Sequence, residues 1–315
     1  MSNSEIVLTG LDGTNPLAFL ASLGVLDVVD RCLRNEGKAV PALRWEDRGR
    51  WVPVLDSQRC LSDLLTLVVD DARSWSNEPV LELTYDANGA LCSDQSRKCK
   101  RDLKPAPRAF REFLESLMRG HFSERSLRLA GSFGSELAVD GKGNIKPTAL
   151  HFSAGQQEFL KMAIELRDSV NKSDFEEALL GPWRGESKLP SFSWDSGSAR
   201  LYALRATDPS AEKRGSVAAA NWLGLLGLRF LPVAVRGTKL QTTCVRGGWK
   251  DAKFTWPLWS ANANARTVAA LLRFTDFSQF GVSERQALGI EAVYRCNIGR
   301  SDQGGYGSFY PATVV

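Results

Sequence analysis

Two apolar segments in opposite halves of the chain, residues 17–29 and 216–235, most constrain how it folds. The first is too short to cross a bilayer, which takes about 20 apolar residues. The second contains Asn221, Arg229 and Pro232, which a membrane span disfavours. A helix that is apolar on all sides must be buried. Both segments are therefore predicted to be helices inside a protein core, with no membrane contact.

The first apolar segment carries the signals of a helix start. Thr14 or Asn15 can cap the helix, and Pro16 suits its first position because a proline there loses no hydrogen bond. We expect the helix to run to about Arg34, with Gly37 marking its exit. Small residues on this helix would allow another backbone to approach closely. They are Ala18, Ala21, Ser22 and Gly24.

Hydrophobic periodicity predicts an α+β fold, with mixed or antiparallel strands at both ends of the chain, apolar helices packed on them and a central helical region. Strands are expected at 6–8, 42–46, 51–55, 80–85, 201–204, 230–236, 240–245, 253–256, 290–296 and 304–310. Helices are expected at 61–68, from 107, at 156–170, 173–180, 215–227 and 267–274. The chain divides into an α+β region (1–130), a glycine-rich loop (131–147) and a second α+β region (148–315), or forms one continuous domain.

Positive charge is unevenly distributed, although the formal net charge is only +4. Residues 97–111 hold seven bases and one acid, and residues 236–253 hold five bases and one acid. Basic surfaces attract nucleic acid because neutralised phosphates release counterions. Within 97–111, Arg108 and Arg111 have glutamates four residues later and are discounted. The remaining candidates for phosphate contacts are Lys98, Lys100, Arg101 and Lys104. The alternative is an ordinary solvated loop.

The glycine-rich segment 131–147 is typical of a mobile loop or a long hairpin. Glycines let a backbone come close to a nucleic-acid groove. Asn144 offers a donor and an acceptor to a base edge, while Lys142 and Lys146 can bind phosphate or guanine. We predict that residues 141–146 of this segment approach the DNA duplex beside the target. A hairpin turn with solvent-facing lysines is the alternative.

Aromatic and basic residues alternate in a third segment. Trp249, Trp256 and Trp259 could stack on bases while nearby cations hold phosphates. Those cations are Arg246, Lys250 and Lys253. Equally, the tryptophans could face the core of a strand pair.

Catalytic motifs are scarce. The sequence has no Walker A, G-x-S-x-G or H-E-x-x-H pattern, and no cofactor is expected. The two histidines, His121 and His151, leave open a metal-independent ribonuclease. Six cysteines follow a start without an export signal, which predicts reduced thiols in a cytoplasm. Only Cys92 and Cys99 are close in sequence, and their spacing matches no zinc pattern.

Two sets of residues resemble a known family. The first is the stretch LTGLDGTNPLAFLASLG at 8–24. The second is the order W-D at 194–195, R-L-Y-A-L at 200–204, D-P-S at 208–210, A-N-W-L at 220–223 and L-P-V at 231–233. Together they resemble proteins of type I-G (formerly I-U) CRISPR systems, in the large-subunit class of the Cascade complex. Many large subunits are longer and end in a helical bundle, whereas this chain is predicted to end in strands.

The resemblance implies a non-catalytic subunit of an RNA-guided effector, with guide RNA, target DNA, other Cascade subunits and a helicase–nuclease as partners. Such a subunit would recognise the motif flanking the target and stabilise opened DNA. Two other interpretations stay open at this point. One is a ribonuclease that processes guide RNA through His121 or His151, and the other is a protein–protein adaptor.

Overall fold

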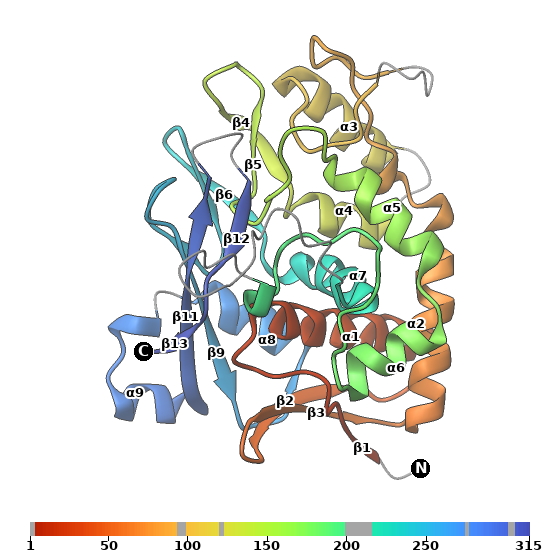
Figure 1. Cartoon of the computed structure of the whole chain (residues 1–315), viewed down its shortest axis with the longest axis vertical. Coiled ribbons are helices and arrows are strands. Elements are labelled where there is room, and N and C mark those ends of the chain that lie inside the picture. The colour runs from red at the N-terminus through yellow and green to blue at the C-terminus, as the bar shows by residue number, and fades with distance from the viewer. Residues whose placement is uncertain (1–3, 93–98, 120–122, 199–215, 275–276, 302–305) are drawn as a thin grey trace, which may run out of the picture.

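Two helices from opposite halves of the chain, α1 (Pro16–Asn35) and α7 (Ala218–Gly227), pack together at the centre of the molecule (Figure 1). Glycines set their distance: a Cβ added to Gly24 would lie 1.9 Å from the Leu223 carbonyl oxygen, and one on Gly227 would lie 2.1 Å from that of Leu20. Both helices are buried along almost their whole length, as predicted. The computed structural model describes residues 4–92, 99–119, 123–198, 216–274, 277–301 and 306–315.

The start of α1 follows its sequence signals. The Asn15 side chain accepts a hydrogen bond from the Leu17 backbone N–H at 2.9 Å, and Pro16 occupies the first helical position. Asn15 also donates through its Nδ2 to Asp195, at 2.7 Å. One residue thus caps the central helix and ties it to a loop from the other half of the chain.

Two antiparallel sheets flank these two helices. The first has the order β1 (Ser4–Val7), β3 (Trp51–Ser57), β2 (Ala42–Asp47) and β10 (Ala263–Asn264). The second has the order β12 (Gly307–Phe309), β11 (Ile290–Arg300), β9 (Lys253–Trp259) and β8 (Val245–Arg246), and β13 (Thr313–Val314) also pairs with β11. The predicted α+β class, with strands at both ends of the chain, is confirmed.

Phe19 of α1 joins the two sheets through aromatic contacts. Its ring centroid lies 6.1 Å from that of Trp45 on β2 and 5.9 Å from that of Trp256 on β9. Because β10 pairs with β2, a strand from the second half of the chain also completes the first sheet. The hydrophobic core therefore draws residues from both halves of the chain.

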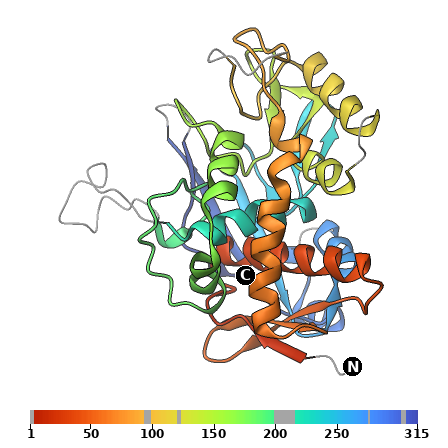
Figure 2. The same ribbon diagram turned by 90° about the vertical axis from the view of Figure 1, so that its right-hand side faces the viewer.

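The remaining helices surround this core (Figures 1 and 2). They are α2 (Leu61–Ser74), α3 (Pro107–Arg119), α4 (Glu124–Ala130), α5 (Phe159–Ser169), α6 (Lys172–Leu180), α8 (Ala265–Arg273) and α9 (Val282–Ala287). Figure 2 shows α2 running vertically across the front of α1. Short 3-10 helices occur at Trp75–Asn77, Pro79–Glu82, Ser196–Ser198, Leu228–Phe230 and Phe277–Gln279. In the described part of the chain, no helix is long and apolar enough to cross a membrane.

Two β-hairpins lie at the upper end of the molecule in Figure 1. They are β4 (Gly134–Val139) with β5 (Ile145–Pro147), and β6 (Val233–Arg236) with β7 (Lys239–Thr242). The backbone N–H of Val233 donates to the Gly131 carbonyl at 3.0 Å, and that of Ala149 donates to Thr242 Oγ1 at 2.9 Å. The glycine-rich segment is therefore a hairpin fastened to a second hairpin.

Two local predictions were wrong. Residues 80–85 do not form a strand, because Pro79–Glu82 makes a 3-10 turn that buries the neighbouring residues Val80 and Leu81 together. A short apolar run does not distinguish a buried strand from a buried turn. Cys92 and Cys99 form a disulfide, contrary to the expectation of reduced thiols. The strand predicted at 201–204 lies outside the described residues.

Candidate nucleic-acid interface

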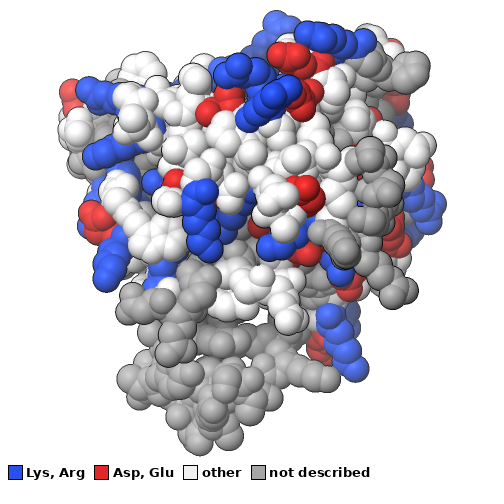
Figure 3. Space-filling model, turned by 90° about the horizontal axis from the view of Figure 1, so that it is seen from above, with Lys and Arg blue, Asp and Glu red and all other residues white. Residues whose placement is uncertain are grey.

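A groove of about 670 Å³ lies between the two hairpins and strand β8. We call it the hairpin groove. It collects cations from separate segments, which are Lys104 before α3, Lys146 on β5, Lys239 on β7, Arg246 on β8 and Arg300 at the end of β11. Figure 3 views this end of the molecule from above, with Lys and Arg side chains recurring on its left-hand side and fewer acidic ones between them.

Within the described part of the chain, these cations make no ion pair with a carboxylate. Asp140 is the one acidic residue among the described residues that line the groove. Its Oδ1 accepts the backbone N–H groups of Lys142 at 2.8 Å and Asn144 at 3.1 Å, so it holds the β4–β5 turn. Among the described residues, no acidic side chain pairs with Lys146 or Lys239. The groove therefore carries a net positive charge that is free to meet an anion.

An exposed tryptophan rests on a half-buried arginine at one wall of the groove. Trp249 is 54% exposed, and the Arg300 guanidinium carbon lies 4.3 Å from the centre of its ring. Arg300 donates to the backbone carbonyls of His151 at 3.0 Å and Ala149 at 2.6 Å. Burial lowers the pKa of Arg300 to about 10, so it stays charged at neutral pH. The indole is thus braced on one side by a fixed cation and exposed elsewhere, as base stacking requires.

The turn of the glycine-rich hairpin lies at the edge of the groove. Gly141 lines the groove, and the space around Gly141 and Gly143 is open for at least 4 Å from an added Cβ. Gly143 has φ +82°, a conformation that favours glycine. Lys142 is exposed and Asn144 is half-buried. The predicted residues of this turn are therefore accessible, although only Lys146 among the three lines the groove.

The four cations predicted to bind phosphates in the segment before α3 do not lie together. Lys104 reaches the groove, whereas Arg101 forms an ion pair with Glu82 at 3.2 Å and does not line it. Lys100 is exposed, and its backbone pairs with Tyr85 away from the groove lining. Lys98 lies outside the described residues. Only one of the four predicted cations is therefore placed in the groove.

The three tryptophans of the aromatic segment also lie in different environments. Trp256 and Trp259 are buried and donate through Nε1 to backbone carbonyls of Gly13 and Leu43, at 2.8 and 2.7 Å. Their part of the stacking prediction was wrong, because both side chains belong to the core. Trp249 is exposed and lines the groove together with Arg246. Lys250 and Lys253 are exposed but do not line the groove.

His151 is a groove-lining residue whose ring is almost fully buried. Its Nε2 lies 2.7 Å from Asp102 Oδ1, which also accepts the Phe159 backbone N–H at 3.1 Å. Burial alone would raise the pKa of Asp102, but the attraction and hydrogen bond of His151 lower it below the usual value. The pair joins the loop before α3 to the segment after β5. His121 lies outside the described residues.

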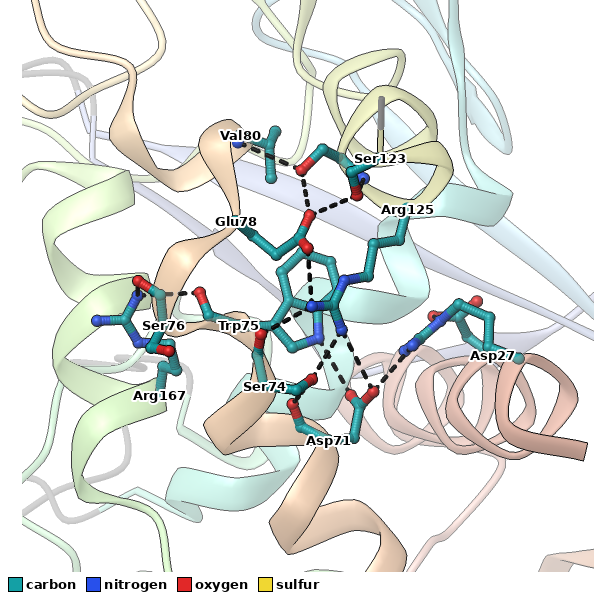
Figure 4. A network of polar contacts seen from close by, with 12 residues as sticks. Asp27, Asp71, Ser74, Trp75, Ser76, Glu78, Val80, Ser123, Arg125 and Arg167 are labelled. Carbon is teal, nitrogen blue, oxygen red and sulfur yellow. Dashed lines mark hydrogen bonds and ion pairs between the residues drawn. The ribbon is translucent and has the colours of Figure 1, made fainter. Parts of the chain in front are cut away.

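A second cluster of charges, centred on Arg125 of α4, is paired internally (Figure 4). Arg125 lies 2.7 Å from Glu78 Oε1 and donates to the Ser74 carbonyl at 2.7 Å. Glu78 Oε2 accepts the hydroxyls of Ser123 at 2.6 Å and Ser126 at 2.5 Å. Figure 4 shows these groups converging on the Trp75 ring, and Arg125 lies 4.6 Å from its centre. We call this cluster the Arg125 network.

Sequence reasoning missed two of the groove cations, Lys239 and Arg300. Lys239 belongs to the basic stretch 236–253 but had no aromatic neighbour to single it out. Arg300 stands alone at the end of a strand, and only the pairing of β11 brings it beneath Trp249. No group of three or more metal-binding side chains occurs among the described residues. No protein-family model and no curated protein matches this chain.

Proposed function

We propose that this chain binds nucleic acid in the hairpin groove without cleaving it. The main support is that four cations from four separate segments line one groove, and none of them makes an ion pair with a carboxylate among the described residues. They are Lys104, Lys146, Lys239 and Arg246. Exposed cations placed together repel one another unless an anion lies between them. A phosphate backbone supplies that anion repeatedly, and Trp249 offers a surface for a base.

The proposal extends to the cellular role implied by the family resemblance. In that role the chain is a cytoplasmic subunit of a type I RNA-guided effector, bound to guide RNA, target DNA and other Cascade subunits, and it helps recruit the helicase–nuclease. The groove supports the nucleic-acid part of this proposal, and the resemblance alone supports the partners. Co-expression with backbone-type Cascade subunits and guide RNA tests it, because a chain that elutes alone at moderate salt would contradict it.

Binding in the groove is tested with a fourfold variant, Lys104→Gln, Lys146→Gln, Lys239→Gln and Arg246→Gln. Affinity for a labelled single-stranded oligonucleotide is measured by fluorescence anisotropy over a range of salt concentrations. Each lost phosphate contact lowers the slope of log affinity against log salt by about 0.7, so the fourfold variant should lose about 3. A slope equal to that of the native chain would remove the groove from the interface. A native chain that binds no oligonucleotide would favour the adaptor interpretation.

The same samples test the non-catalytic claim. Labelled repeat RNA incubated with the purified chain should be recovered intact. Cleavage that disappears in His151→Ala would instead support the ribonuclease alternative, since His151 lines the groove. Because His151 also holds Asp102, the variant's unfolding curve must be recorded beside the assay.

The β4–β5 turn is proposed to read the motif beside the target. Its support is the accessible turn at the groove edge, where Asn144 can pair with a base edge. Lys142→Ala and Asn144→Ala should each lose roughly 1–3 kcal/mol of binding on the correct motif and much less on a scrambled one. Equal losses on both targets would make the turn a phosphate contact only.

A further inference from the structure

A second groove, of about 450 Å³, lies where α8 passes the ends of α1 and α4. Five of its lining residues are arginines, and no carboxylate is among its described lining residues. The arginines come from four places in the chain and are Arg34, Arg128, Arg229, Arg266 and Arg273. We call it the arginine groove. It shares no lining residue with the hairpin groove.

Three of these arginines are fixed by carboxylates that lie outside the groove lining. The pairs are Arg34 with Asp30 at 2.9 Å, Arg128 with Glu124, and Arg229 with Asp27. The first two are spaced i, i+4 on their own helices, and the third joins the segment after α7 to α1. These pairs hold the side chains in place and reduce the entropy that a ligand must overcome.

The other two arginines have no such partner. Arg266 and Arg273 are exposed on α8, and neither makes an ion pair within the described part of the chain. Seven residues apart, they lie two helical turns from each other on one face, about 10 Å along the axis. The small residues Ala269 and Ala270 lie between them and also line the groove. Two guanidinium groups separated by small side chains can each bind a phosphate of the same chain. Such an arrangement suits a polymer of phosphates better than a single isolated anion.

The lining distinguishes a polyphosphate from an acidic protein segment. Protein interfaces are anchored by large apolar or aromatic residues at their centre. Here the one aromatic lining residue in the described structure, Phe230, is 1% exposed and lies beneath the Arg229 guanidinium at 4.7 Å. Arginine is the side chain best shaped for phosphate oxygens, because its planar fork donates two parallel hydrogen bonds.

We propose that the arginine groove is a second contact for nucleic acid, which holds the sugar–phosphate backbone and does not read bases. The proposal extends the function proposed above, since the ligand is the same polymer, but it depends on a different surface. A nucleic acid long enough to reach both grooves would then bind more tightly than a short one that fills the hairpin groove alone.

The test is the double variant Arg266→Gln, Arg273→Gln, with a long single-stranded oligodeoxythymidine as the probe. Two lost contacts should lower the salt slope by about 1.4. The matched control, Arg108→Gln with Arg119→Gln, removes the same charge from α3, where these side chains are 91% and 80% exposed. A control that lowers the slope equally would overturn the proposal, because net charge would then explain the effect.

Two further comparisons distinguish binding in the arginine groove from binding in the hairpin groove, and a nucleic-acid ligand from an acidic protein. If the fourfold hairpin-groove variant leaves the slope unchanged while the Arg266/Arg273 variant lowers it, the arginine groove stands without the other site. If neither lowers it, or the native chain binds no oligonucleotide, both fail. If the double variant loses affinity for poly-glutamate but not for DNA, the groove binds an acidic protein and the nucleic-acid proposal is overturned.

Discussion

The Arg125 network and the hairpin groove both gather basic side chains, but they differ in what surrounds each cation. In the network, Arg125 contacts Glu78 at 2.7 Å. Arg125 also lies 3.7 Å from Asp71, which pairs with Arg31 at 2.8 Å. In the groove, no carboxylate among the described residues pairs with Lys146 or Lys239. Positive charge alone therefore does not indicate a binding surface. What matters is whether the protein has already neutralised it.

The difference has an energetic consequence. The network is partly buried, with the Arg125 side chain 20% exposed and Glu78 13% exposed. Removing one partner there leaves the other charge without compensation in a poorly solvated place. The groove cations Lys146, Lys239 and Arg246 are exposed and hydrated, so removing them costs the fold little. Substitutions in the network should therefore lower stability without changing binding, and substitutions of exposed groove cations should weaken binding without changing stability.

The largest expected effect is on the network. Arg125→Met should lower the free energy of unfolding by about 3–5 kcal/mol, because the partly buried Glu78 carboxylate loses the cation that compensates it. Urea denaturation measures the loss, and the folded fraction should bind nucleic acid with unchanged affinity. Arg246→Met is the matched control in the groove, and we expect it to change stability by less than about 0.5 kcal/mol. Equal destabilisation by both variants would erase the distinction between the regions.

A smaller effect should appear in binding only. Trp249→Ala removes the exposed ring that rests on Arg300 and should weaken single-strand binding by about 1–3 kcal/mol. Trp249→Phe keeps an aromatic face and should retain most of the affinity. Anisotropy titrations measure both variants. Unchanged affinity in Trp249→Ala would mean that the groove holds phosphates without stacking a base.

The smallest expected effect is a pH dependence of stability at Glu78. Burial would raise the pKa of this carboxyl, but Arg125, Ser123 and Ser126 lower it below its ordinary value of 4.5. A carboxyl with a lowered pKa stabilises the fold fully above its unfolded pKa, and that contribution disappears as the pH falls through the folded pKa.

The variant Glu78→Gln keeps an acceptor but loses the charge. It should cost about 1 kcal/mol at neutral pH, the difference between a charged and a neutral hydrogen bond, because Asp71, 3.7 Å from Arg125, still balances that cation. Its stability should also fall less steeply below pH 4.5 than that of the native chain. Unfolding curves at several pH values measure this, and a parallel fall in both proteins would mean that Glu78 makes no stabilising pair.

Sequence patterns predicted the central fold well because burial leaves a strong periodic signal. The two apolar segments predicted the two central helices. The small residues of the first segment predicted the close backbone approach that is found at Gly24. The same patterns failed at 80–85, where Pro79 turns a short apolar run into a 3-10 helix. Short segments contain too few residues for periodicity to distinguish the two.

The candidate site was only partly predictable. Local composition marked Lys104, Lys146, Arg246 and Trp249, which do line one groove. It also marked Arg101, whose partner Glu82 lies on another segment, and Trp256, which faces the core. Charge pairing and side-chain direction depend on tertiary contacts. No local pattern reveals them.

Lysine footprinting can show directly whether nucleic acid occupies the hairpin groove, because the method needs no substitution. The chain is acetylated briefly with and without a saturating single-stranded oligonucleotide, and mass spectrometry reports the labelling of each lysine. Nucleic acid in the hairpin groove should protect Lys146 and Lys239 and leave the labelling of Lys161 and Lys172, which are exposed on α5 and α6, unchanged. Unchanged labelling of Lys146 and Lys239 in the bound state would contradict the claim that nucleic acid occupies the hairpin groove.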